Sequence, residues 1–576
     1  MDTLKKLNKL LDKRSKINAF FLLIMIIIGS IAELLGVAII LPIVNLAMDE
    51  QFMQNKWCKW LSQITGLQTR EQILLLIIAI TIVIYILKNL YLSWMYSKLY
   101  LFSADVKMQM ATRLMEAYLQ QPYSFFLKSN TPELIRTVSI DTSQLYEAIS
   151  HCLLILSNGF TAVLLLITLL ATNIYMTLLV TVLLGGCALL SLLVIRKKTH
   201  YYGERNQELA STLTECLQQA FEGIKEVKIV NSEQFFIDRY KTNYQEQTDI
   251  LRKFKITTLI PKYIIEVVCI AGIMLYLAIN VAYNPDYISI IPQLAVFVAA
   301  AYKLLPSVNS INNSANIVIY NKASIDLVYH DIQMANQVDE IEEIYSNNQD
   351  ELLFKNEIQL QNVSFWYKKN ERKILDNVTF AIPKGKSTAF VGPSGGGKTT
   401  TADIVLSLLA PKEGEVLIDD VDVKTNIEGW RKKIGYIPLN IYLLDTSIKE
   451  NIALGVSVDK IDEDRVMEAI KKAQLLEFVE SLPYGIDTKV GERGNNISGG
   501  QKQRIGIARA LYRNPEVLVF DEATSALDVQ TEKEVMHAID ALHGEKTIIM
   551  IAHRLSTIEN CDIVYKIDNG HIERER

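Results

Sequence analysis

The chain has 576 residues, 50% of them hydrophobic, and a positive mean hydropathy, so it is long enough for more than one domain and has the composition of a membrane protein. Its formal net charge is only -5 and its basic residues form no tail beyond the first few lysines, which argues against a nucleic-acid partner. The six cysteines lack CxxC or Cys/His spacing, so neither a zinc site nor a disulfide framework is expected.

Six apolar stretches dominate the chain up to about residue 315. They cover residues 18–47, 72–101, 150–172, 175–196, 257–283 and 287–313, and each is long enough to cross a hydrocarbon core of about 30 Å as a helix. The first stretch is too long for a signal-peptide core and lacks a small-residue cleavage pattern, so we interpret it as a span. Residues 1–330 are therefore predicted to form an α-helical membrane domain with six transmembrane helices.

The distribution of lysine and arginine predicts the orientation of these spans. The N-terminal segment and the segments after the second and fourth spans are basic, whereas the loops TNIYM and YNPDY contain neither residue type. Positive residues favour the cytoplasmic side, so both termini are predicted to be cytoplasmic. The segments after the second and fourth spans continue as polar, helix-compatible sequence, which predicts helices that project into the cytoplasm.

The first outer connection contains Trp57, Trp60, Leu61 and Ile64 at helical spacing. This spacing fits a short amphipathic helix at the outer membrane interface. An ordinary connecting loop with interfacial aromatic residues fits the same pattern.

Four charged residues lie inside the predicted spans: Glu33, Lys88, Glu266 and Lys303. Ionisable side chains are costly in a bilayer, so they are candidates for the lining of a substrate cavity. Lysines that face a central cavity would favour an anionic head group. A purely structural role is the other interpretation, with Glu33 and Lys88 paired or the lysines reaching an interface.

The remainder of the chain has a different pattern. Residues 331–356 are acidic and polar and are predicted to be a linker, and residues 357–576 alternate short apolar stretches with turns and charges. Within this second domain, GPSGGGKTT matches GxxxxGK[ST], follows a strand-like run and precedes an apolar helix. Its residues are Gly392, Pro393, Ser394, Gly395, Gly396, Gly397, Lys398, Thr399 and Thr400. This pattern predicts a phosphate loop for ATP, with Lys398 at the β and γ oxygens and Thr399 as a Mg²⁺ ligand.

A second strand-like run, EVLVF, ends in Asp521 and Glu522. Phosphoryl transfer to water needs a carboxylate for Mg²⁺ and another for the attacking water, and we assign these roles to Asp521 and Glu522 respectively. Two acids at a strand end are common, but together with the phosphate loop they are specific.

A second cradle-like motif, ISGGQ, lies between these two signals. Ser498, Gly499, Gly500 and Gln501 begin a predicted helix and offer N–H donors and a hydroxyl to a γ-phosphate. The chain already has one complete phosphate-binding loop. A second phosphate-binding motif is explained if it closes over the nucleotide bound to another copy of the chain. At this point the whole chain resembles ATP-binding cassette (ABC) transporters, whose signature ISGGQ matches with Ile497 in place of the usual leucine.

The family resemblance implies further site residues. Tyr367 matches the aromatic residue that stacks on adenine, His553 matches the switch histidine at the γ-phosphate, and Ser525 to Asp528 match the loop that contacts the opposite subunit. TKVGERG, residues 488–494, is similar to a motif typical of exporters. Together with six preceding spans, these matches imply a type IV exporter half-transporter with an α/β P-loop cassette domain, most simply a homodimer, with a heterodimer as the alternative.

The cargo is implied by a finer resemblance. The run from Ala300 to Tyr329, with IGYIP-NIYL and EGIKEVKIV at 222–230, resembles bacterial flippases for lipid-linked oligosaccharides of protein N-glycosylation. It implies a polyprenyl-diphosphate glycan moved from the cytoplasmic to the outer leaflet of a bacterial inner membrane. Another lipid, a peptide or a drug is the alternative cargo. An ATP-binding membrane sensor is the alternative of another class.

Leu439 departs from the family pattern. The stretch GYIPLNIYLLDTS, residues 435–447, has leucine where the family usually has a glutamine whose amide reaches Mg²⁺ and the attacking water. Leucine can do neither. Three explanations are open: the site tolerates the loss, the amide of Asn440 replaces it, or the chain is an engineered or degenerate variant or half of a heterodimer with one weak site.

Overall fold

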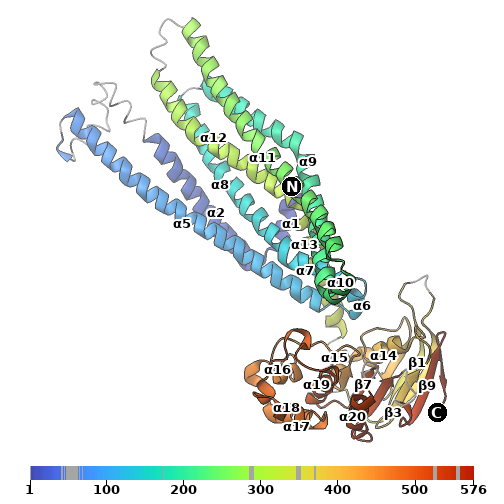
Figure 1. Ribbon diagram of the computed structural model, residues 1–576. Helices are drawn as coiled ribbons and strands as arrows, with labels where there is room; N and C mark the ends of the chain where they lie inside the picture. The colour runs from blue at the N-terminus through green and yellow to red at the C-terminus, as the bar shows by residue number, and fades with distance from the viewer. Residues whose placement is uncertain are drawn as a thin grey trace. The chain divides into compact units, whose positions relative to one another are not determined.

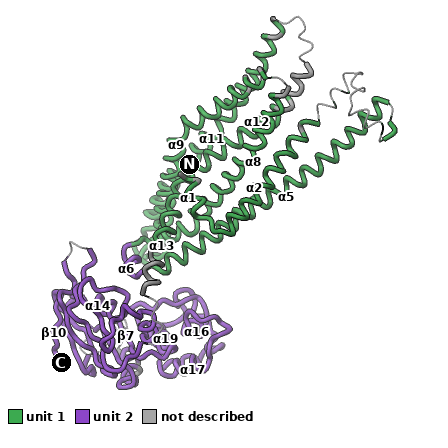
Figure 2. The backbone as a smooth tube through the Cα atoms, turned by 180° about the vertical axis from the view of Figure 1, so that it is seen from behind, with its two compact units in different colours: residues 1–121, 129–337 green, residues 122–128, 338–576 purple. Residues whose placement is uncertain are grey.

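The computed structural model describes residues 2–39, 43, 46, 63, 65–67, 69–172, 174–283, 291–345, 352–368, 372–522, 529–552 and 558–576. The chain divides into two compact units (Figure 2). The first comprises Met1–Gln121 and Ser129–Gln337, and the second comprises Pro122–Lys128 and Val338–Arg576. The predicted amphipathic segment around Trp57 lies outside the described residues.

Long α-helices build the first unit (Figure 1). They are α1 (Asp2–Leu10), α2 (Lys13–Ala38), α5 (Arg70–Leu119), α7 (Thr131–Arg136), α8 (Thr142–Thr172), α9 (Ile174–Glu222), α10 (Ile224–Val230), α11 (Glu233–Tyr283), α12 (Ile291–Tyr320) and α13 (Lys322–Tyr345), with a π-helix, η2 (Thr137–Asp141), between α7 and α8. Helices α5, α9 and α11 have 50, 49 and 51 residues. At 1.5 Å per residue each is about 75 Å long, more than twice the thickness of a hydrocarbon core.

Four helical segments in the described part of the chain are long and apolar enough to cross a membrane. They are Lys13–Gly36, Arg70–Leu119, Thr131–Leu170 and Glu233–Ile279. The fourth and sixth predicted spans, 175–196 and 287–313, fall mainly within helices α9 and α12. These six spans stay a prediction, as does their orientation.

The helices of the first unit lie side by side in a constant order. Both views show α2 and α5 on one side, α9 and α11 on the other, and α8 and α12 between them (Figures 1 and 2). The apolar core between α8, α9, α11 and α12 includes Leu165, Ile265 and Leu304, which are almost fully buried. Burial of these large side chains accounts for the close packing of the central helices.

Polar side chains join α8 to α12 and α13 along one line, which we call the polar seam. The α8 members are spaced seven residues apart, so they share one helix face. The pairs of the seam are Asn158 with Ser310 at 3.0 Å, His151 with Ser314 at 2.9 Å, and Gln144 with Ser324. Small and polar residues at a helix contact allow close approach and hydrogen bonding in apolar surroundings.

A buried ion pair lies at the π-helix. Asp141 is fully buried, and its Oδ2 is 3.2 Å from Nε of Arg136. Its Oδ1 accepts hydrogen bonds from Ser324 at 2.5 Å and from Gln207 at 2.9 Å. The guanidinium of Arg136 also donates to the backbone carbonyl of Gln207 at 3.0 Å. This network ties η2 to α9 and α13, and the π-helix, which adds one residue to a helical turn, carries the carboxylate at its end.

The first half of the predicted linker is helical. Helix α13 extends to Tyr345, although the polar composition of residues 331–356 suggests a linker. Ile325, Val328 and Ile332 are buried at helical spacing, so an apolar stripe packs the first half of this helix against the unit.

The second unit is an α/β fold. Its strands are β1 (Glu357–Phe365), β2 (Leu375–Pro383), β3 (Ser387–Val391), β4 (Glu413–Ile418), β5 (Val421–Asp422), β6 (Ile434–Ile437), β7 (Val517–Asp521), β8 (Thr547–Ile551), β9 (Ile563–Asp568) and β10 (His571–Arg574). Its α-helices are α6 (Tyr123–Phe126), α14 (Lys398–Val405), α15 (Ile427–Lys432), α16 (Ile448–Ile452), α17 (Glu463–Lys472), α18 (Leu476–Ser481), α19 (Gly499–Tyr512) and α20 (Val529–Asp540).

Two sheets organise these elements. An antiparallel sheet has the order β2-β1-β4-β5, and a six-stranded sheet has the order β10-β9-β3-β8-β7-β6. Within the larger sheet β9, β3, β8, β7 and β6 are parallel, and only β10 pairs antiparallel. The central strands read as short continuous apolar runs because both of their faces are buried.

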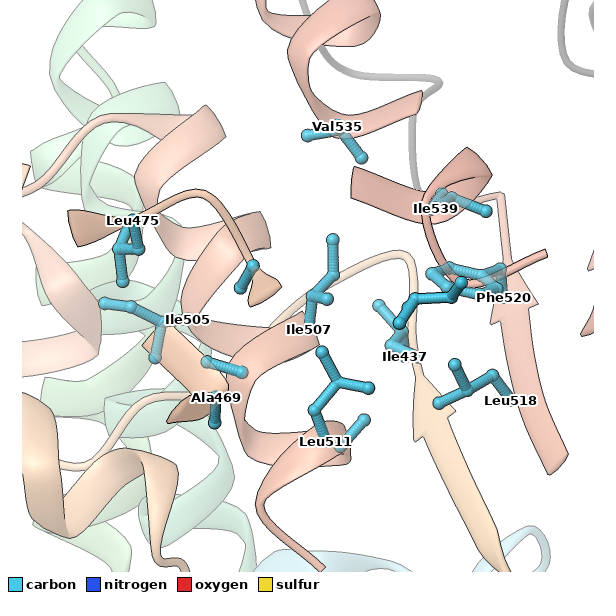
Figure 3. Packing of buried hydrophobic residues seen from close by; sticks show 14 of the residues in the cluster. Ile437, Ala469, Leu475, Ile505, Ile507, Leu511, Leu518, Phe520, Val535 and Ile539 are labelled. Carbon is cyan, nitrogen blue, oxygen red and sulfur yellow. The ribbon is translucent and has the colours of Figure 1, made fainter. Parts of the chain in front are cut away.

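Helix α19 forms the core of the second unit with the parallel sheet. Figure 3 shows Ile507 and Leu511 of α19 near Ile437, Leu518 and Phe520 of strands β6 and β7. These side chains are at most 7% exposed. The packing fixes α19, and with it the signature motif at the start of this helix, on the sheet.

Candidate nucleotide-binding site

The carboxyl edge of the parallel sheet gathers the predicted nucleotide residues. Strand β3 leads into the phosphate loop, β7 ends at Asp521, and β6 leads to Leu439. Both β3 and β7 pair with β8, so the loop and the two acids lie one strand apart. In a parallel α/β sheet this edge is where ligands bind.

The phosphate loop has a backbone that only glycine permits. Gly392, Gly395 and Gly397 have φ angles of 139°, 76° and 110°. A Cβ atom at Gly392 would lie 2.1 Å from the carbonyl oxygen of Ile567, and one at Gly396 would lie 2.8 Å from the same atom. The glycines therefore allow a tight loop whose N–H groups can surround phosphate oxygens.

Lys398 begins helix α14 and closes the loop. Its Nζ donates to the carbonyl oxygens of Gly392 and Pro393, each at 2.9 Å. Burial lowers the pKa of Lys398, while the charges of Glu522 and Asp521 oppose this shift. A buried ammonium at a helix N-terminus beside a glycine cradle fits the phosphates of ATP.

Thr399 and Asp521 supply the oxygen atoms that Mg²⁺ prefers. Thr399 is exposed, and Asp521 lies half-buried at the end of β7. Burial raises the pKa of Asp521, and the charge of Glu522 raises it further. A bound cation would reverse this effect, because it stabilises the carboxylate form. The residues present therefore fit the predicted metal.

Glu522 follows Asp521 in a left-handed backbone conformation. Its φ is 50°, and its N–H donates to the carbonyl of Ile551 on β8 at 3.1 Å. A non-glycine residue with positive φ is uncommon, and such strain is frequent at functional sites. Strand β7 therefore ends at Asp521, and Glu522 begins the turn that follows it.

Tyr367 lies beside the phosphate-loop helix. Its hydroxyl is 3.2 Å from Oγ1 of Thr400, and its ring packs edge-on against Phe365 at 5.2 Å between centroids. The side chain is 38% exposed. An aromatic ring held at its edge and open to solvent can stack on a base.

Three residues beside Asp521 are absent from the sequence prediction: Tyr436, Asp403 and Tyr123. The Tyr436 hydroxyl donates to Oδ2 of Asp521 at 3.2 Å. Burial and then the charge of Asp521 raise the pKa of Asp403 to about 6. Burial, followed by the charges of Asp403, Tyr367 and Asp521, raises the pKa of Tyr123 in α6. Asp403 lies one helical turn after Thr399, so the sequence could have indicated it, whereas Tyr123 precedes Asp403 by 280 residues.

Leu439 follows β6 with its side chain 37% exposed. The neighbouring Asn440 is also exposed, and its side chain makes no hydrogen bond to the described residues. The polar contact to Asp521 at this edge comes instead from Tyr436. The described geometry therefore does not support the explanation that the amide of Asn440 replaces that of the usual glutamine.

The signature motif forms a capped helix start. Ser498 is the N-cap of α19: its Oγ accepts from the N–H of Gln501 at 3.3 Å, and its own N–H donates to Oε1 of Gln501 at 2.8 Å. A Cβ at Gly499 would meet nothing within 4 Å, whereas Gly500 is buried. The first turn thus presents an open glycine surface that can receive an anion. Ser525, Asp528 and His553 lie outside the described residues.

Three of the four charged residues predicted in the spans come together in the first unit. Oε2 of Glu33 on α2 lies 2.8 Å from Nζ of Lys303 on α12 and 3.6 Å from Nζ of Lys88 on α5. We call these residues the charged triad. Glu266 on α11 is exposed, and no ion pair joins it to the triad.

Comparisons with known proteins agree with this architecture. The ABC transporter family profile matches residues 375–525, and the ABC transporter transmembrane region profile matches residues 16–283. An ATP-dependent lipid A-core flippase of Haemophilus influenzae is 31% identical over 82% of this chain and 80% of its own length. The heterocyst differentiation ATP-binding protein HepA of Nostoc is 29% identical, over 82% of this chain and 77% of its own.

A solved structure has the same fold. The structure of a bacterial Atm1-family ABC exporter with ATP bound aligns with a TM-score of 0.78, covers 98% of this chain and 96% of its own, and is 24% identical. The matched profiles, the relatives and the nucleotide-site geometry lead to one conclusion. The chain belongs to the ABC transporter family, as a half-transporter in which a helical membrane domain precedes an ATP-hydrolysing cassette domain, and it is an ATP-driven exporter.

Proposed function

We propose that this exporter is a flippase for a polyprenyl-diphosphate-linked oligosaccharide or a related glycolipid. The charged triad carries the proposal, because two ammonium groups share one carboxylate within helices that are predicted to span the membrane. The excess positive charge suits an anionic head group, since an intramembrane charge needs a partner. Relatives named lipid A-core flippases support a glycolipid cargo as well.

In this proposal the cassette residues bind and hydrolyse ATP. Tyr367 stacks on adenine, the loop from Gly392 to Thr400 holds the phosphates, and Asp521 with Thr399 holds Mg²⁺. The ion neutralises charge on the phosphates when it is bound. Glu522 accepts the proton of the attacking water, and His553 contacts the γ-phosphate.

The proposed assembly is a homodimer in a bacterial inner membrane, with both termini in the cytoplasm. One copy has one phosphate loop and one signature, so Ser498, Gly499, Gly500 and Gln501 of one protomer close over ATP bound to the other. The open first turn of α19 supports this arrangement. Ser525 and Asp528 contact the opposite protomer. ATP thereby pulls the cassettes together and tips the spans outward.

Reconstitution into liposomes tests the proposal. A fluorescent polyprenyl-diphosphate glycan on one leaflet is expected to reach the other leaflet with ATP and Mg²⁺, and to stay in place with the Glu522→Gln variant. Translocation no faster than in that variant would refute the flippase assignment. A lipid A-like lipid and a neutral polyprenol of equal chain length, tested in parallel, show whether the cargo is another lipid.

A further inference from the structure

The charged triad joins helices from two different parts of the first unit. Glu33 and Lys88 lie on α2 and α5, which are also linked by hydrogen bonds from the Tyr85 hydroxyl to the carbonyl of Gly36 at 2.8 Å and from the Tyr91 hydroxyl to the carbonyl of Met25 at 2.9 Å. These links fix Glu33 and Lys88 on one paired element.

Lys303 belongs to a different helix pair. It lies on α12, whose seam to α8 includes the bond between Asn158 and Ser310 at 3.0 Å. The ion pair between Lys303 and Glu33 at 2.8 Å therefore joins the α8–α12 pair to the α2–α5 pair. Its loss would remove an electrostatic tie between the two pairs.

The two lysines differ in accessibility. The side chain of Lys88 is 4% exposed, and its Nζ lies 4.4 Å from the ring centroid of Tyr85, so it is enclosed. The side chain of Lys303 is 32% exposed, although it makes the shorter contact with Glu33. An incoming anion can therefore reach Lys303 while Glu33 keeps Lys88 as its partner.

We propose that Glu33 is an internal counter-ion of Lys303 that the anionic head group of the cargo displaces. This inference rests on the flippase proposal for the chemistry of the cargo. Before cargo binds, Glu33 neutralises Lys303 and ties α2 to α12. A diphosphate brings more negative charge than one carboxylate, so it replaces Glu33 at Lys303, and Glu33 remains paired with Lys88. Cargo binding thus breaks this ion pair between α2 and α12, while the buried hydrogen bond between Thr161 on α8 and Ser30 on α2, at 3.2 Å, still joins the two helix pairs.

The test measures binding of undecaprenyl diphosphate to the full-length protein in nanodiscs. Glu33→Gln removes the carboxylate that competes with the lipid for Lys303. Affinity for undecaprenyl diphosphate is therefore expected to rise about tenfold. Lys303→Gln is expected to weaken binding. In the Lys303→Gln background, Glu33→Gln is expected to change affinity far less, because its competitor role depends on Lys303.

Matched controls separate this role from a general loss of structure. Glu116→Gln removes an exposed carboxylate of α5 that lies outside the predicted spans, and it is expected to leave affinity unchanged. Neutral undecaprenol is expected to bind equally to the parent and to Glu33→Gln. If Glu33→Gln folds poorly, Glu33→Asp, which shortens the side chain and lengthens its contact with Lys303, is expected to show a smaller rise in affinity.

The outcomes distinguish this inference from the flippase proposal. Unchanged or weaker diphosphate binding by both Glu33 variants, or an equal gain for undecaprenol, overturns the counter-ion role even if the parent flips the glycolipid. A selective gain that requires Lys303 supports it, even if no glycan-linked lipid is transported. Inorganic pyrophosphate, added alone, shows whether the head group suffices for the exchange.

Discussion

The hydroxyl of Tyr436 donates a hydrogen bond to the carboxylate of Asp521 at 3.2 Å, at the sheet edge where the family pattern has an amide. Leu439, three residues later, is exposed and cannot ligate a cation. A tyrosine hydroxyl bound to the carboxylate does not supply the amide that, in the family pattern, orients the attacking water.

Leu439→Gln is therefore expected to raise the ATPase rate, on the order of tenfold, because a positioned polar group typically contributes at least this factor. The rate of phosphate release by the purified protein measures the effect. Asn440→Ala is the matched variant, and its rate should equal that of the parent. An unchanged rate in Leu439→Gln would mean that this site does not depend on the amide, and a fall in Asn440→Ala would assign the role to Asn440.

Because Asp403 is a buried carboxyl, the stability of the nucleotide-free cassette is expected to depend on pH. Asp403 is 8% exposed, and burial raises the pKa of its carboxyl from 3.8 to about 6. The folded state then binds more protons than the unfolded state between these values, so its contribution to stability falls as pH rises from about 4 to 6 and stays low above. A shift of about two pKa units corresponds to roughly 3 kcal/mol.

Asp403→Asn is expected to raise the unfolding temperature of the cassette at pH 8 and to raise it much less at pH 4.5. Thermal unfolding of the full chain without nucleotide, followed by tryptophan fluorescence, measures both values. Asp420→Asn, in an exposed turn, is the control. An equal gain at both pH values would show that the change acts through something other than the charge of Asp403.

The buried pair of Arg136 and Asp141 is expected to dominate the stability of the first unit near the π-helix. Asp141→Leu leaves the Arg136 charge buried and unpaired, which should lower the free energy of unfolding by about 3–5 kcal/mol. Glu208→Leu removes one exposed partner of Arg205, at 2.8 Å, and should cost less than about 1 kcal/mol. Unfolding of both variants in mixed micelles measures the difference, and similar losses would contradict a special role for the buried pair.

A double-mutant cycle tests the polar seam. Asn158→Ala and Ser310→Ala remove the two ends of a 3.0 Å hydrogen bond. Their coupling energy is expected to be about 0.6 kcal/mol, the average for hydrogen bonds between membrane helices. Ser191→Ala removes a different hydrogen bond of α12, which Asn312 donates to Ser191 on α9 at 2.9 Å, and should show no coupling to Asn158→Ala. Strictly additive effects of the first pair would mean that the hydrogen bond between Asn158 and Ser310 contributes nothing.

The predicted nucleotide site rests on local motifs. The phosphate loop needs glycines and a lysine at fixed spacing, so its residues can be read from a short stretch, and the strand before Asp521 is an unbroken apolar run. These features depend on neighbours in sequence, which a single sequence displays.

Contacts between distant segments were not predictable in the same way. A pair of Glu33 with Lys88 was one interpretation of the sequence, but the shorter contact of Glu33 with Lys303, which is 270 residues away, was not predicted. The helical conformation of residues 331–345 was not predicted, because their polar and acidic composition carries no clear helical pattern. Tyr123 reaches the nucleotide edge through tertiary structure alone.

The polar seam also restricts which motions the exporter can make. Its partners on α8 recur every seven residues, so sliding α8 by one turn against α12 would separate Asn158 from Ser310 and His151 from Ser314 together. These paired positions fix the register of α8 against α12, as a buried asparagine fixes the register of a coiled coil. The two helices then behave as one rigid body. Helices α8 and α12 are therefore expected to move together. Relative motion within the membrane unit then occurs at the contacts that these two helices make with their outer neighbours.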